Sequence, residues 1–111
     1  MPHCIIEHSS AIDGAHLLKP VFDGALKSAL FDEKGSDIKV RTVSYNDYLT
    51  GTEKSDFIHV ILKILSGRTE QQKLSLSETM ISELKSLNIQ HCSLTVEVVD
   101  IERSTYSKVL T

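Results

Sequence analysis

The sequence predicts an α+β fold in which two consecutive β-α-β units form one four-stranded sheet, with both helices on one face of it. The first observation behind this prediction is the order of the hydrophobic periodicities, which runs strand, helix, strand and then repeats. The second is the spacing, since each half takes roughly 50 residues, as an internal duplication of architecture would. Crossovers between parallel strands are right-handed in nearly all proteins, so both helices should cover the same face.

The first half covers residues 2–48. Its opening strand is expected over residues 3–8, where a short apolar run has polar ends. A helix is predicted over residues 16–30, because the apolar positions there follow helical spacing. Pro20 is compatible with that helix only in its first turn, where its missing N–H is not needed. The segment 38–45 returns to the two-residue period of a strand.

The second half covers residues 56–101 and repeats the pattern. A strand rich in Ile, Val and Leu is expected over residues 57–65. Thr69 then starts a helix, with Gln72 at the spacing of a capping box. A last strand over residues 94–101 precedes a polar tail. The apolar stripe of the helix is predicted from Leu74, Ile81, Leu84 and Asn88, with Leu76, Met80 and Leu87 alongside.

Length, composition and charge narrow the class of protein. The chain has 111 residues, of which 41% are hydrophobic, so a single domain over residues 1–111 with its own core is expected. No apolar run approaches the ~20 residues that span a membrane, and the N-terminus lacks the pattern of a signal peptide, which predicts a cytoplasmic protein without a membrane partner. A net charge of -3 without a long basic run argues against nucleic acid as the partner.

Cysteine and histidine usage predicts no metal centre. Cys4 and Cys92 lie far apart in sequence, and in a reducing compartment they are expected to be buried thiols rather than a disulfide. No Cys-x-x-Cys pair occurs, and no two of the 5 histidines are spaced i, i+4 on a helix.

The sheet face away from the helices is expected to be partly apolar. On the third strand this face carries either Ile58, Val60, Leu62 and Ile64, or His59, Ile61, Lys63 and Leu65. The second set is half apolar, and Ile5, Val99 and Ile101 are available nearby. Because such a face is too apolar to be left in water, we expect another copy of the chain to cover it.

Pro2 is the first candidate catalytic residue. Methionine is normally trimmed before a residue as small as proline, which would leave Pro2 with a free secondary amine. An α-amino group titrates near pH ~7.7–8.0, and apolar surroundings and nearby cations lower its pKa. Such an amine can act as a general base at neutral pH. The alternative is that Met1-Pro2 is an ordinary start without a chemical role.

Two cations share one face of the strand predicted over residues 38–45. Lys39 and Arg41 lie on that face, and Ile38 and Val40 lie on the other. The two cations could bind an anionic substrate or simply form a solvated strand face, and the residues alone leave both interpretations open.

Two stretches resemble a known superfamily. Residues 58–72, IHVILKILSGRTEQQ, resemble the start of 4-oxalocrotonate tautomerase, where an N-terminal proline leads through a strand into Gly-Arg-Ser and a helix. Over residues 2–101 the chain is still more similar to 5-carboxymethyl-2-hydroxymuconate isomerase, a double-length member of that superfamily. The similarity lies in the Met-Pro-His start, in Ile-x-x-Arg at residues 38–41 and in the turn Gly67-Arg68.

The resemblance implies a tautomerase fold and a cofactor-independent isomerase of aromatic catabolism. Such an enzyme moves a proton within an unsaturated 2-hydroxy (dienol) di- or tricarboxylic acid. The resemblance makes Pro2 the acid/base, with Lys39, Arg41 and Arg68 binding the substrate carboxylates. It also implies a homotrimer with one base per chain. The family usually carries arginine where this chain has Lys39, and lysine cannot form a bidentate fork with a carboxylate.

A different class of function also fits the pattern. Two β-α-β units in a small acidic chain suit a non-catalytic oligomeric ligand-binding module, in which Pro2 merely begins a strand. The N-terminal mass distinguishes the two, because an active tautomerase requires the loss of Met1.

Overall fold

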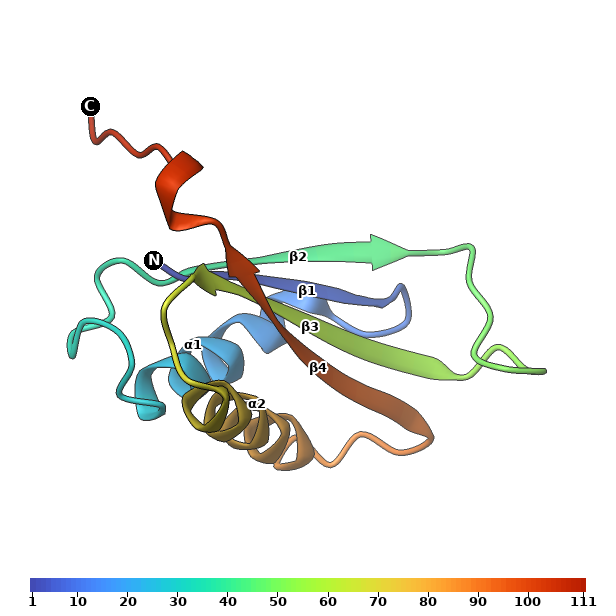
Figure 1. Cartoon of the computed structure of the whole chain (residues 1–111). Helices are drawn as coiled ribbons and strands as arrows, with labels where there is room; N and C mark the ends of the chain where they lie inside the picture. Colours follow the sequence, from blue (N-terminus) through green and yellow to red (C-terminus); the bar gives the residue numbers. More distant parts are fainter.

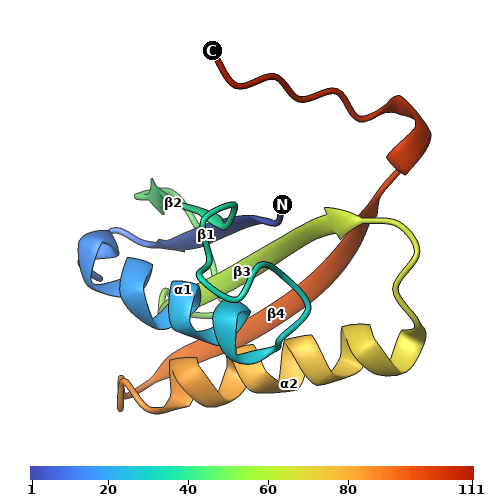
Figure 2. The ribbon, with the colours of Figure 1, turned by 90° about the vertical axis from the view of Figure 1, so that its left-hand side faces the viewer.

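A computed structural model describes residues 1–111 as one four-stranded sheet in the order β2-β1-β3-β4, with α1 and α2 packed on one face (Figures 1 and 2). Strand β1 runs parallel to β2 and antiparallel to β3, and β3 runs parallel to β4. The predicted α+β architecture is confirmed. The elements are β1 (His3–Ser9), the 3₁₀ helix η1 (Gly14–Leu17), α1 (Leu18–Lys27), β2 (Lys39–Tyr45), β3 (Asp56–Leu65), α2 (Glu70–Lys85), β4 (Cys92–Ile101) and the 3₁₀ helix η2 (Arg103–Thr105).

Helix α1 is shorter than the sequence predicts. Its regular part begins at Leu18, which places Pro20 in the first turn as expected. The predicted extension to residue 30 is wrong, because the chain leaves the helix after Lys27 and Ala29 adopts a left-handed φ of 59°. A residue in that conformation ends a helix by redirecting the backbone.

Helix α2 begins where the capping box predicts. Thr69 Oγ1 accepts a hydrogen bond from the Gln72 backbone N–H at 3.1 Å, and the Thr69 N–H donates to Gln72 Oε1 at 2.8 Å. The side chains buried against the sheet are Leu76, Met80 and Leu84. Leu74 is instead 47% exposed, so its place in the predicted stripe is wrong. Positions 74 and 76 point about 200° apart on a helix of 3.6 residues per turn, so both cannot face the sheet.

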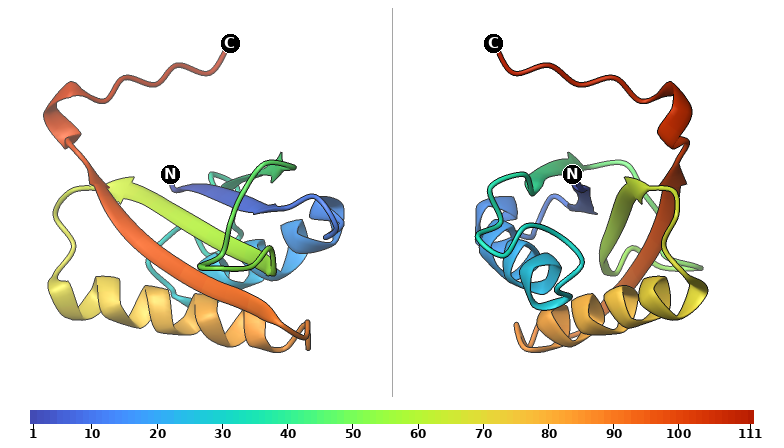
Figure 3. Two further views of the ribbon diagram at one scale, coloured as in Figure 1. Left: turned by 90° about the vertical axis from the view of Figure 1, so that its right-hand side faces the viewer. Right: turned by 60° about the vertical axis from the view of Figure 1, so that its left-hand side comes forward.

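The core fills the space between the sheet and the helices (Figure 3). Alternate residues of the two central strands point into it, as the two-residue period requires. Its fully buried members are Cys4, Ile6, Leu17, Val21, Ala25, Ile58, Val60, Leu62, Ile64, Leu76, Met80 and Leu84. Both cysteines are free thiols, and Cys4 is buried while Cys92 is partly buried.

The opposite sheet face carries no helix and is called here the open face. Because Ile58, Val60, Leu62 and Ile64 are buried under the helices, the second predicted set, residues 59, 61, 63 and 65, lies on the open face. Val43 and Tyr45 on β2 are 42% and 36% exposed on that face. No helix of the chain has the length and apolarity needed to cross a bilayer.

Candidate active site

The strand register gathers the candidate residues at one end of the sheet. His3 pairs with Lys39 of β2 on one side and with Lys63 of β3 on the other. Since Cys4 points into the core, its neighbour His3 lies on the open face, and so do its two partners. Lys39 and Lys63 thus lie on either side of His3 in a row across three strands, called here the cationic row after its two lysines, and Arg41 follows Lys39 on the same face.

His3 lies between an arginine and a tyrosine. Arg41 Nη1 is 3.1 Å from His3 Nδ1, and His3 Nε2 is 3.1 Å from the hydroxyl of Tyr106. The rings of His3 and Tyr106 meet edge to face, with centroids 6.2 Å apart. Burial lowers the pKa of His3 below its usual 6.5, and the positive charges of Arg41, Lys39, the N-terminal amine and Lys63 lower it further.

Pro2 precedes the cationic row and is fully buried. Its carbonyl oxygen accepts a hydrogen bond from the Lys39 backbone N–H at 3.1 Å, which fixes the start of β1 beside the start of β2. With Met1 attached, the Pro2 nitrogen is part of an amide and cannot take up a proton. The structure thus brings Pro2, Lys39 and Arg41 to the same end of the sheet.

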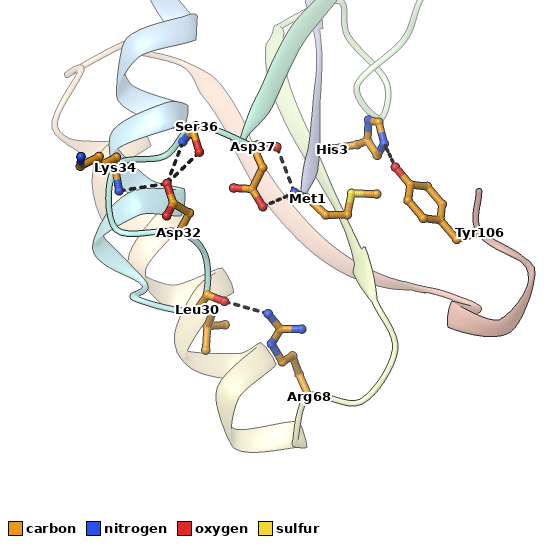
Figure 4. A network of polar contacts seen from close by, with 9 residues as sticks. All are labelled: Met1, His3, Leu30, Asp32, Lys34, Ser36, Asp37, Arg68 and Tyr106. Atoms are coloured by element: carbon orange, nitrogen blue, oxygen red, sulfur yellow. Dashed lines mark hydrogen bonds and ion pairs between the residues drawn. The ribbon is translucent and has the colours of Figure 1, made fainter. Parts of the chain in front are cut away.

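A carboxylate lies beside the N-terminal amine. The Met1 amine donates to the Asp37 backbone oxygen at 3.0 Å and to Asp37 Oδ2 at 2.5 Å (Figure 4). This contact holds the pKa of the Asp37 carboxyl below its usual value. The second oxygen, Asp37 Oδ1, is buried without a hydrogen-bond partner. Asp37 thus adds a carboxylate to this cationic end of the sheet.

Arg68 lies at the turn from β3 to α2, directly after Gly67, whose φ of 121° suits glycine. Its Nη2 donates to the Leu30 carbonyl at 2.7 Å, and its guanidinium lies 5.7 Å from the centre of the Phe31 ring. Figure 4 shows the side chain reaching toward the loop that follows α1. Arg68 therefore contacts the first half of the chain at Leu30 and Phe31, not Lys39 or Arg41. Arginine has five N–H donors, so most of its donors are free for a ligand.

Three residues near the site were not selected from the sequence. Lys63 could have been found by pairing the first strand antiparallel with the third, because the register places it beside His3. Asp37 gives no signal beyond its place just before β2. Tyr106 belongs to the tail after β4, which shows no periodicity, and only the tertiary fold brings it to His3.

Neither hollow of the single chain contains these residues. The larger, about 420 Å³, lies at the other end of the sheet between η1 and the end of α2. The second, about 350 Å³, lies between α1 and the edge strand β2 and is lined by Leu18, Lys19, Phe22, Ile38 and Val40. The larger hollow offers no cation, so we favour the Pro2 end for anion chemistry on the basis of its charges. In the single chain, the side chains of Lys39 and Arg41 at the Pro2 end are exposed to solvent.

Comparisons with known proteins identify the family and the fold of the chain. A family model described as 5-carboxymethyl-2-hydroxymuconate isomerase matches residues 2–109. No curated protein matches the chain significantly in sequence.

Several solved structures share the fold. A protein crystallised after inactivation by 2-oxo-3-pentynoate superposes with a TM-score of 0.82 at 15% identity, over 96% of this chain and 90% of the other. A 5-carboxymethyl-2-hydroxymuconate isomerase from Deinococcus radiodurans R1 gives 0.75 at 16% identity, over 99% and 90%. A fused 4-OT described as a wild-type symmetric trimer gives 0.72 at 17% identity, over 92% and 87%. At these identities the structures show a common fold.

Proposed function

Because the chain belongs to the 5-carboxymethyl-2-hydroxymuconate isomerase family and is an isomerase of the tautomerase kind, we propose that the amine of Pro2, freed by removal of Met1, is its acid/base. The proposed substrate is an unsaturated 2-hydroxy di- or tricarboxylic acid of the type formed when aromatic rings are cleaved. The observation that carries the proposal is the register, which sets Lys39 and Lys63 on either side of His3, the residue directly after Pro2.

The proposed reaction is a proton shuttle. The Pro2 nitrogen accepts the proton of the substrate 2-hydroxyl, and the electrons of that O–H bond form the C2=O double bond. The electron pair of the C2=C3 double bond moves to form C3=C4, and the pair of the C4=C5 double bond forms a new C–H bond at C5 with the proton returned by Pro2. A base of this kind contributes most when its pKa is near the working pH. Lys39, Arg41 and Lys63 lie at the same end of the sheet as Pro2, and nearby positive charge favours the neutral, proton-accepting form of an amine.

The cations would bind the negatively charged groups of the substrate. Lys39 and Arg41 lie on one strand face at the Pro2 end and would bind a carboxylate or the developing enolate oxygen. Arg68 would bind a second carboxylate through the donors that Leu30 does not use.

A homotrimer supports this chemistry, because proton transfer of this kind needs a site shielded from water. Lys39 and Arg41 are exposed in the isolated chain and line neither hollow, so we expect other copies to supply the enclosing walls. The open face offers an apolar surface for such an assembly, and the fused 4-OT relative is described as a trimer.

The proposal is tested by following the ultraviolet absorbance of 2-hydroxymuconate-type dienols as the protein turns them over. Trimmed protein should isomerise the dienol, and Pro2→Ala, which leaves a primary amine with a freer lone pair, should lose about 100-fold in kcat/KM. Chain that retains Met1, confirmed by its mass, should be less active still. Equal activity with and without Met1 would remove Pro2 from the mechanism.

A further inference from the structure

The hydroxyl of Tyr106 lies at the candidate site, and its hydrogen-bonding state can be deduced from the side chains around it. Tyr106 is in the tail, directly after η2, and its backbone N–H donates to the Arg103 carbonyl at 3.4 Å. The residue is partly buried, whereas residues 107–111 are exposed. The fold therefore holds the tail as far as Tyr106 and brings its ring against His3 (Figure 4).

Arg41 fixes the proton on the His3 ring. A guanidinium can only donate hydrogen bonds, so His3 Nδ1, 3.1 Å from Arg41 Nη1, must accept. A ring that accepts at Nδ1 is neutral and carries its proton on Nε2. That Nε2–H then donates to the Tyr106 oxygen at 3.1 Å.

The surroundings of His3 favour the same neutral state. Its ring is partly buried and faces four positive groups, namely Arg41, Lys39, Lys63 and the N-terminal amine, all of which disfavour an imidazolium.

This series of hydrogen bonds, from Arg41 through His3 to Tyr106, leaves the Tyr106 O–H without an acceptor. Its oxygen accepts from His3, and its own hydrogen takes part in no hydrogen bond within the chain. Tyr45, on the same sheet face, differs because its hydroxyl is occupied in donating to Glu7 Oε2 at 3.0 Å. A free donor beside Lys39, Lys63 and Arg41 suits an anionic oxygen of a ligand.

We propose that Tyr106 is a substrate-binding residue that donates a hydrogen bond to an anionic oxygen of the unsaturated carboxylic acid, and that His3 is the positioning residue that aims it. The inference rests on the proposed function, because it places the substrate at the Pro2 end of the sheet. It adds a residue of the tail to a site otherwise built from strands and from the turn at Arg68. It also gives the Arg41 side chain a second task, which is to fix the tautomer of His3.

Turnover and binding test the inference together. In trimmed protein Tyr106→Phe should lower kcat/KM for the dienol by about 100-fold, the usual cost of one lost donor to a developing oxyanion. It should also weaken binding of fumarate, an unreactive unsaturated dicarboxylate, by about tenfold in calorimetry. The matched control Tyr45→Phe, which removes an occupied hydroxyl from the same face, should change neither quantity. His3→Gln, which can keep an N–H donor, should retain more activity than His3→Ala.

Nitrogen NMR of His3 supplies a readout that does not depend on activity. At pH 7.5 the ring should carry its proton on Nε2, both in the wild type and in Tyr106→Phe. Unchanged turnover and fumarate binding in Tyr106→Phe, a proton on Nδ1, or no fumarate binding by the wild type would each overturn the inference. If Tyr106→Phe weakens fumarate binding in a protein that does not isomerise dienols, the proposed function fails and the assignment of Tyr106 stands.

Discussion

At the scale of single residues, His3 is a group whose protonation the fold controls through two side-chain contacts and the charges around it. Its ring accepts from Arg41, donates to Tyr106 and lies in the cationic row with Lys39 and Lys63. Protonation of Nδ1 would place a proton against a donor of Arg41, so the contact would be lost. The site arrangement therefore depends on a neutral His3.

Stability should consequently fall in mild acid. The folded-state pKa of His3 lies below its usual 6.5, so the unfolded chain binds a proton more readily as the pH drops. The stabilisation is present above pH ~6.5 and is lost as the pH falls through the folded-state pKa. Urea unfolding between pH 8 and pH 5 should show a loss in the wild type that is smaller in His3→Gln. An identical pH dependence in both proteins would contradict this account.

The sequence predicts some site residues better than others for a physical reason. The alternation of a strand put Lys39 and Arg41 on one face, and the structure agrees because a two-residue period cannot place them otherwise. Lys63 needed the register between strands distant in sequence, which local patterns do not contain. Tyr106 needed the path of an irregular tail, for which the sequence has no periodic signal.

At the scale of the elements, Arg68 links the two halves of the duplication. From the turn before α2 it donates to Leu30 and lies over the Phe31 ring, both in the segment that follows α1. The sequence located this turn and its capping box, because glycine, arginine and threonine mark it locally. It did not indicate that the arginine also braces the neighbouring loop, which depends on how α1 and α2 pack.

Loss of Arg68 should therefore affect both binding and stability. Arg68→Ala should lower kcat/KM by about 100-fold, as the loss of a charge-assisted carboxylate contact would. Phe31→Leu, which removes the ring under the guanidinium but keeps the cation, serves as the matched control and should stay close to wild-type turnover. Steady-state kinetics and urea unfolding of both variants separate the two roles. Normal turnover by Arg68→Ala would reduce this residue to a structural brace.

At the scale of the whole molecule, the chain has two unlike sheet faces. One packs the core beneath α1 and α2, and the other is partly apolar and carries the cationic row. The net charge of -3 hides this local excess of positive charge. Composition predicted no nucleic-acid partner, and it does not reveal where in the fold the cations gather.

The open face should be buried in a homotrimer. Sedimentation should find a trimer at micromolar protein, and Ile61→Asp, which puts a charge on the apolar part of that face, should dissociate it. Ser75→Asp changes an exposed polar position of α2, on the helix side of the sheet, and should leave the assembly intact. A wild-type chain that sediments as a stable monomer at this concentration would contradict the prediction.

The most direct test of the central claim, that the Pro2 amine is the reacting base, is covalent labelling with 2-oxo-3-pentynoate, which inactivates one protein of the same fold. A neutral amine nitrogen adds to the alkyne, and its proton passes to the adjacent alkyne carbon, so the protein gains the mass of the intact reagent. Peptide mass spectrometry should find one reagent per trimmed chain, on the peptide that begins with Pro2. Chain that retains Met1 should stay unlabelled there, because its Pro2 nitrogen is an amide. Equal labelling of both forms, or labelling confined to another residue, would contradict the account.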